Sequence, residues 1–260
     1  MSRAEYPEWL EGVWCRALTE SGCPASHAEA TRIGLKLLER WCNPARRFHG
    51  IWHLIAVLEK IDELSQEASC PPLVRLAAFY HGVVLSTNPP DQPSGITGED
   101  HTLSAQLAHG QLLHLGLEET KTERICDLIN GLTSRPPVAP EPDLAVLCDS
   151  ERAVLASDPR AYRAYSAALR QEFSNGNLES FLLARVAVLQ GWLRQERCFS
   201  TAAATAWEDA ARNNIEAELI RCRQELIAKG NLNSEELEAT TVIPNQKGIT
   251  KPSSVPQTEP

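Results

Sequence analysis

Apolar residues recur every three or four positions from the start of the chain to about residue 228, and this spacing constrains the fold more than any other feature. Such a period places apolar side chains along one face of a helix, whereas the alternation typical of half-buried strands is scarce. Two examples are the stripes formed by Trp9, Leu10, Val13, Trp14 and Leu18 and by Ile33, Leu37, Leu38 and Trp41. The sequence therefore predicts an all-α fold.

Several helix boundaries are also indicated. Ser26 and Glu29 have the spacing of a capping box. Pro71-Pro72 suits the first turn of a helix, and Asp158-Pro159 supplies an N-cap followed by proline. Further helices are expected at His101–Leu115, Glu119–Leu132, Asp143–Ala156, Asp158–Phe173, Ser180–Arg194 and Ala202–Ala228.

Two segments lack the helical pattern. Ser86–Gly98 contains three prolines and two glycines, which predicts a loop between helices. Beyond Trp207 there is no aromatic residue, and Gly230–Pro260 is polar with four prolines. We therefore expect one helical domain over residues 1–228 and a disordered polar tail over 229–260.

Charge and composition exclude several classes of function. The formal net charge is −9, and no basic run exceeds the pair Arg46-Arg47, so nucleic acid is not expected as the main partner. No stretch approaches the roughly 18 consecutive apolar residues of a membrane span, and no signal peptide is indicated. A cytoplasmic protein is predicted. Its eight cysteines are scattered without a CxxC pair, which favours free thiols over a zinc cluster.

The histidines offer candidate metal ligands. His49 and His53 are four residues apart, so both imidazoles lie on one face of a helix, and His81 ends another hydrophobic helix. Asp149 and Glu151 lie two residues apart on a later helix, so their side chains point in different directions. At most one of them would be a natural metal ligand. Imidazoles and a carboxylate are the composition of a divalent-metal site. Packed or surface histidines are the structural alternative.

Six segments in order carry a further pattern: RRFHGIWHL (46–54), LAAFYHGVV (76–84), HTLSA (101–105), LINGLTSR (128–135), LCDSERAVLA (147–156) and AYRAYSAALRQEF (161–173). The first resembles R-x-Y-H-N-x-x-H-I, the second A-x-W-F-H-D-x-V and the fifth F-L-D-A-D-L-A-I-L-G. These motifs belong to a family of predicted metal-dependent phosphohydrolases of the HD superfamily. The resemblance covers roughly residues 6–222.

The resemblance implies an HD-domain-like helical bundle that holds a divalent ion (Mn, Mg, Zn or Fe) and hydrolyses a phosphoester through metal-activated water. It implies a phosphorylated small molecule or a nucleotide as substrate. The metal ligands that it suggests are His49, His53, His81, Asp149 and His101. It also suggests catalytic roles for Arg46, Arg170 and Glu172, for which structural ion pairs are the alternative.

The chain departs from the family pattern at the HD doublet, where Gly82 replaces the aspartate. Gly50, His101 and Pro136 replace three further polar residues of the pattern. Two functions are therefore compatible with the sequence: a hydrolase with a rebuilt metal site, and a catalytically inactive binding or regulatory protein that keeps the fold. In the first case, Gly82→Asp is expected to tighten metal binding.

Overall fold

The computed structural model describes residues 6–85, 98–132, 141–173 and 177–228. The expected tail lies outside the described residues, and so does the expected loop at Ser86–Gly98 apart from Gly98 itself. Nothing in the structure therefore bears on those two predictions.

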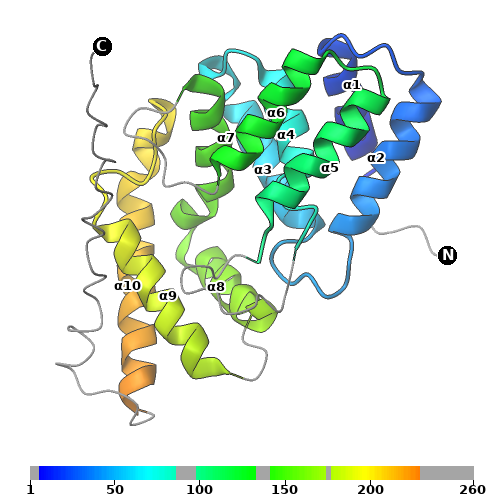
Figure 1. The fold of residues 1–260 in the computed structure, drawn as a ribbon. Helices are drawn as coiled ribbons and strands as arrows, with labels where there is room; N and C mark the ends of the chain where they lie inside the picture. The colour runs from blue at the N-terminus through cyan, green and yellow to red at the C-terminus, as the bar shows by residue number, and fades with distance from the viewer. Residues whose placement is uncertain (1–5, 86–97, 133–140, 174–176, 229–260) are drawn as a thin grey trace, which may run out of the picture.

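The regular secondary structure of the described residues is helical, which confirms the all-α prediction (Figure 1). They contain no strand, only a single bridge between Leu85 and Glu99. The helices are α1 (Trp9–Glu20), α2 (His27–Trp41), α3 (Ile51–Glu63), α4 (Pro71–Tyr80), α5 (His101–His114), α6 (Glu119–Gly131), α7 (Pro142–Arg152), α8 (Pro159–Phe173), α9 (Leu178–Leu193) and α10 (Glu208–Ala228), with short 3-10 turns at Ser65–Glu67, Ala153–Ala156 and Ala203–Trp207.

Local sequence signals explain where helices begin. The Ser26 hydroxyl accepts a hydrogen bond from the Glu29 backbone N–H, and the Asp158 carboxylate accepts from the N–H groups of Arg160 and Ala161. These side chains satisfy backbone donors that have no partner inside the helix. Two expected helices are shorter than the sequence predicts, because Ala153–Ala156 and Ala203–Trp207 tighten into 3-10 turns.

The helices pack into two hydrophobic clusters. The N-terminal cluster joins α1 to α7, and the C-terminal cluster runs from Leu155 through α8, α9 and α10; Trp207 packs against both. Figure 1 shows α9 and α10 side by side along one edge of the molecule. In the N-terminal cluster Gly34 lets α2 approach α1, since a Cβ there would lie 2.5 Å from the Trp14 ring.

Among the helices that the structure describes, none combines the length and apolar character required to span a bilayer. All eight cysteines are free, as predicted. The feature that matters most for function is the convergence of helix ends between the two clusters. The start of α3, the end of α4, the start of α5 and the ends of α7 and α8 meet there.

Candidate metal centre

Three buried side chains from separate elements bring potential metal ligands together. They are His53 in the first turn of α3, His81 directly after α4 and Glu99 just before α5. One nitrogen or oxygen of each lies within 4.8 Å of the others. His81 Nε2 is 3.4 Å from His53 Nε2 and 3.9 Å from Glu99 Oε1. Two nitrogens bound at about 2.0–2.1 Å to one tetrahedral ion lie about 3.4 Å apart, so this spacing fits a shared ion.

A backbone carbonyl fixes the orientation of His81. Its Nδ1 lies 2.6 Å from the Ala78 carbonyl oxygen, which can only accept a hydrogen bond. The proton of the neutral ring is therefore on Nδ1, and the lone pair of Nε2 faces His53 and Glu99. Histidines that bind metals are commonly held in this way, with the second nitrogen donating to a carbonyl or carboxylate.

The protonation states suit metal binding. Burial, with the neighbouring His81 ring, places the pKa of His53 well below its usual value, and burial also lowers the pKa of His81. Both rings are therefore neutral near pH 7. Burial opposes ionisation of Glu99, but His49, His101 and His81 outweigh it and lower the pKa of that carboxyl group. Within the described residues Glu99 Oε1 has no hydrogen-bond donor, although it is buried.

The backbone on both sides of Glu99 is fixed. Leu85 and Glu99 form the single bridge, and the Asp100 N–H donates to the Val84 carbonyl at 2.9 Å. The Asp100 carboxylate in turn caps α5 by accepting from the Leu103 N–H. These contacts hold the Glu99 side chain beside Gly82 at the end of α4.

Glu99 occupies the space where a side chain of residue 82 would begin. A Cβ added to Gly82 would lie 2.5 Å from Glu99 Oε1 and 2.6 Å from the Trp41 ring. Glu99 thus places a carboxylate beside His81, next to the position where residue 82 has no side chain. An aspartate at residue 82 would have to displace Glu99 Oε1 and the Trp41 ring. This packing argues against the expectation that Gly82→Asp tightens metal binding, which stays a prediction.

His49 forms a second arrangement with a carboxylate from α8. Its Nδ1 lies 2.6 Å from Glu172 Oε2, and Glu172 Oε1 accepts from the Arg47 backbone N–H at 3.0 Å. Burial lowers the pKa of His49, but Glu99 and Glu172 outweigh burial and raise it. Because Nδ1 donates to Glu172, Nε2 is the nitrogen left to act in the cavity that His49 lines.

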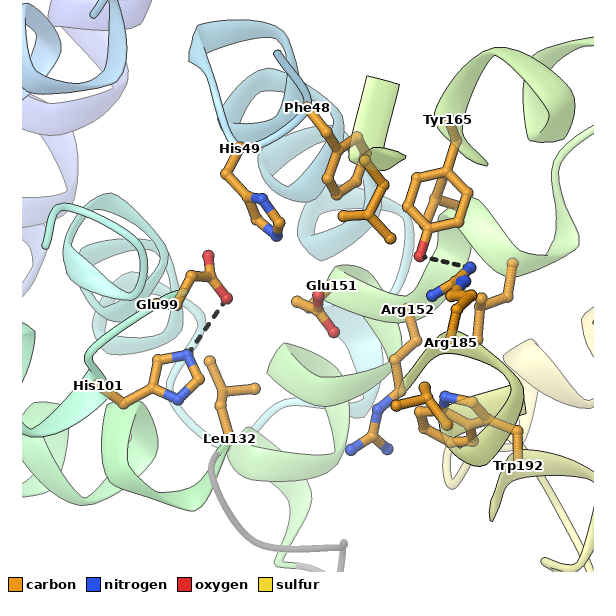
Figure 2. Close-up of a pocket in the computed structure, with 14 residues that line it drawn as sticks. Phe48, His49, Glu99, His101, Leu132, Glu151, Arg152, Tyr165, Arg185 and Trp192 are labelled. Atoms are coloured by element: carbon orange, nitrogen blue, oxygen red, sulfur yellow. Dashed lines mark hydrogen bonds and ion pairs between the residues drawn. The ribbon is translucent and has the colours of Figure 1, made fainter. Parts of the chain in front are cut away.

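A cavity of about 240 Å³ opens beside these groups. Figure 2 shows His49, Glu99 and His101 on one side, Tyr165, Arg185, Arg152 and Trp192 on the other, and Glu151 between them. His101 Nε2 faces Glu99 Oε2 at 3.4 Å. Burial and the charge of Glu99 raise the pKa of Glu151. A neighbouring cavity of about 410 Å³ also reaches Glu151 and is lined by His53, Lys60 and Trp207.

Asp149, expected to be a metal ligand, faces away from this group. Its carboxylate accepts hydrogen bonds from the Ser200 N–H, the Thr201 N–H and the Thr201 hydroxyl, at 2.7 to 3.0 Å. These donors fix the segment that leads into α10, so the oxygens are already used. Glu151, two residues later, is the carboxylate of α7 that reaches the cavities.

The two arginines proposed for catalysis have structural partners. Arg46 donates to the backbone carbonyls of His49, Gly82 and Val83, and it stacks on Trp41. Arg170 forms two hydrogen bonds of 2.8 Å to the Glu225 carboxylate. Neither lines the cavity. The Glu172 carboxylate contacts His49 Nδ1 and is not among the residues that line the cavity.

Of the five expected metal ligands, the structure brings His53 and His81 together with Glu99, whereas His49 and His101 line the adjacent cavity with Glu151. No spacing in the sequence identifies Glu99, because it follows Ser86–Gly98, a stretch whose sequence has no helical pattern. Comparisons with protein-family models, curated proteins and solved structures found no match to this chain.

Proposed function

We propose that the chain is a divalent-metal-dependent phosphohydrolase in which His53, His81 and Glu99 hold the ion. The observation that carries this proposal is the buried group itself, with an ionised carboxylate whose Oε1 lacks a hydrogen-bond donor among the described residues. A buried carboxylate without a partner is costly, and a cation would compensate it. The proposal takes the bundle as HD-like and the protein as cytoplasmic, following the sequence resemblance.

The donor set favours particular ions. Two imidazoles and a carboxylate suit zinc, iron or manganese, whereas magnesium prefers oxygen ligands alone. When bound, such an ion would lower the pKa of a water molecule and polarise a phosphoryl oxygen. Glu151 and His101 are further groups close enough to complete the ligand set or to contact the substrate.

The chain's own residues supply proton transfer and exclude water. Glu172 orients His49, so that His49 Nε2 can accept a proton from attacking water or return one to the leaving group. Phe48 and Leu132 line the same cavity and limit the access of solvent. A volume of about 240 Å³ lies below the roughly 300–1,000 Å³ of pockets for drug-sized ligands. We therefore expect a small phosphoester.

The proposal is tested by the metal content of variants. The untagged protein, purified without chelator from medium that contains zinc, iron and manganese, is analysed for bound metals beside His81→Ala and Glu99→Gln. We expect near-stoichiometric metal in the parent protein and at least a tenfold loss of affinity in both variants, because His81→Ala removes a ligand nitrogen and Glu99→Gln replaces a charged oxygen with a neutral one. His109→Ala, on the exposed face of α5, is the matched control and should retain the metal.

A panel of small phosphoesters, assayed with each ion, then tests hydrolysis. Equal metal content in the parent protein and in His81→Ala would contradict the site. Stoichiometric metal without turnover of any phosphoester would instead favour a binding or regulatory protein that keeps the metal centre.

A further inference from the structure

Arg152, the last residue of α7, is a buried cation on the wall of the cavity. Its side chain is only 7% exposed, and its guanidinium lies over the Trp192 ring, 4.9 Å from the centroid. Nη1 has no hydrogen-bond partner, and no described residue forms a hydrogen bond or ion pair with the guanidinium. Figure 2 shows it across the cavity from Glu99 and His101.

Two other arginines near the cavity are neutralised or hydrogen-bonded. Arg185, which lines the same cavity, donates twice to Glu218 at 2.8 Å and once to the Tyr165 hydroxyl. Arg46 donates to three carbonyls. Burial raises the pKa values of Asp149 and Glu151, and the nearby Arg152 only opposes that rise; no ion pair joins either carboxylate to it. A buried guanidinium without a partner is costly unless a ligand compensates it.

We infer that Arg152 binds the oxyanion of the substrate, and that this oxyanion is a phosphate group. A guanidinium presents a planar fork of N–H donors that matches phosphate and carboxylate oxygens, and stacking on Trp192 holds the plane of the fork. The inference deepens the proposed function and rests on it for the identity of the substrate. The position corresponds to leucine in the motif F-L-D-A-D-L-A-I-L-G, so the anion site is a feature of this chain.

The charges around the cavity support this assignment. Glu99, whose side chain is buried, and the half-buried Glu151 both line it, and an anion would be repelled there without a cation. The histidine side of the cavity can supply a metal ion, and the opposite side supplies Arg152. An oxyanion between these two positive groups is held from both ends, which positions a phosphoester for attack.

The test measures binding of inorganic phosphate by isothermal titration to the full chain, both metal-loaded and stripped with chelator. We expect Arg152→Leu to weaken phosphate binding about tenfold or more in both forms, and Arg152→Lys to weaken it less, because lysine keeps the charge but loses the fork. Arg163→Leu, at an exposed position on α8, is the matched control and should bind phosphate as the parent protein does. Circular dichroism verifies folding, and if Arg152→Leu does not fold, the lysine variant carries the test.

The outcomes separate this inference from the metal proposal. Equal phosphate affinity in the parent protein and in folded Arg152→Leu, or in Arg152→Lys where only that variant folds, overturns the inference even if metal is bound. Loss of phosphate affinity with unchanged metal content supports it. If the parent protein holds no metal and Arg152→Leu still binds phosphate more weakly than the parent does, the result supports the anion site and contradicts the metal centre. Acetate binding as tightly as phosphate would overturn the assignment to phosphate and point to a carboxylate ligand.

Discussion

Gly82 illustrates how a single residue limits what the metal centre can tolerate. Gly82→Ala should lower the free energy of unfolding by about 1–3 kcal/mol, because its Cβ collides with Glu99 and Trp41. The same substitution should also lower metal affinity, because the Cβ displaces the Glu99 carboxylate. Chemical denaturation and metal titration measure both effects. The control is Gly110→Ala on α5, where a Cβ meets nothing within 4 Å and helix propensity predicts a gain of about 0.5–1 kcal/mol.

The ion pair of Arg185 and Glu218 predicts a pH dependence of stability. Burial would raise the pKa of Glu218, but Arg185, Ser166 and Tyr162 outweigh it and lower that pKa below its usual 4.5. A lowered pKa in the folded state gives stability that is present above pH 4.5 and is lost as the pH falls towards the folded-state pKa. Glu218→Gln should remove this acid-dependent part and cost about 3–5 kcal/mol at pH 7, because Arg185 stays buried without its counter-charge.

Denaturation of both proteins across pH 3 to 7 measures the effect. Glu225→Gln, which alters the partly exposed pair with Arg170, is the comparison and should cost less than about 1 kcal/mol. Parallel pH profiles for the parent protein and Glu218→Gln would contradict the role given to Glu218.

At the level of single residues, the sequence identified histidines of the candidate site and missed a carboxylate whose position depends on tertiary packing. The prediction that His49 and His53 share one helical face is wrong for His49, because α3 begins at Ile51 and His49 lies before it. The two rings still lie 5.6 Å apart between centroids. Glu99 gains its role only when the end of α4 meets the start of α5. Asp149 and Glu151 could not be separated, because their choice depends on where the Ser200-Thr201 backbone lies.

Among the elements, Arg46 connects the start of α3 to the end of α4 through the carbonyls of His49, Gly82 and Val83. Arg46→Met should lower the free energy of unfolding by about 2–3 kcal/mol, since it removes hydrogen bonds from a charged donor. It should also reduce metal affinity about tenfold, because the two helix ends carry His53 and His81. Arg75→Met, which loses only its contact with exposed Asp62, should leave metal affinity unchanged in the same titrations.

Helix positions were largely predictable, because capping residues and apolar periodicity are local. Ser26 and Asp158 cap the helices that they were expected to cap. The 3-10 turns after α7 and before α10 were not predicted, since they depend on contacts between segments. The Asp149 contact with Thr201 ties the end of α7 to the chain before α10 and is one such contact.

On the scale of the whole molecule, the site lies where the two hydrophobic clusters meet. Glu172 of α8 hydrogen-bonds His49 ahead of α3, so both clusters contribute to it. Metal at about 100 times its dissociation constant should add about 2.7 kcal/mol to the free energy of unfolding. Calorimetry with and without chelator measures the shift. An equal shift in His81→Ala would show that the ion binds elsewhere.

A side chain at residue 82 would occupy the space of the Glu99 carboxylate, so the effect of a substitution at one position depends on the residue at the other. Gly82→Asp alone collides with Glu99, and Glu99→Ala alone leaves the histidines without their carboxylate. Only the pair of changes exchanges one carboxylate for the other, so the two substitutions are strongly non-additive. Under the proposed function, each single substitution is therefore expected to weaken metal binding, and the double substitution to restore part of it, which is sign epistasis between residues 82 and 99.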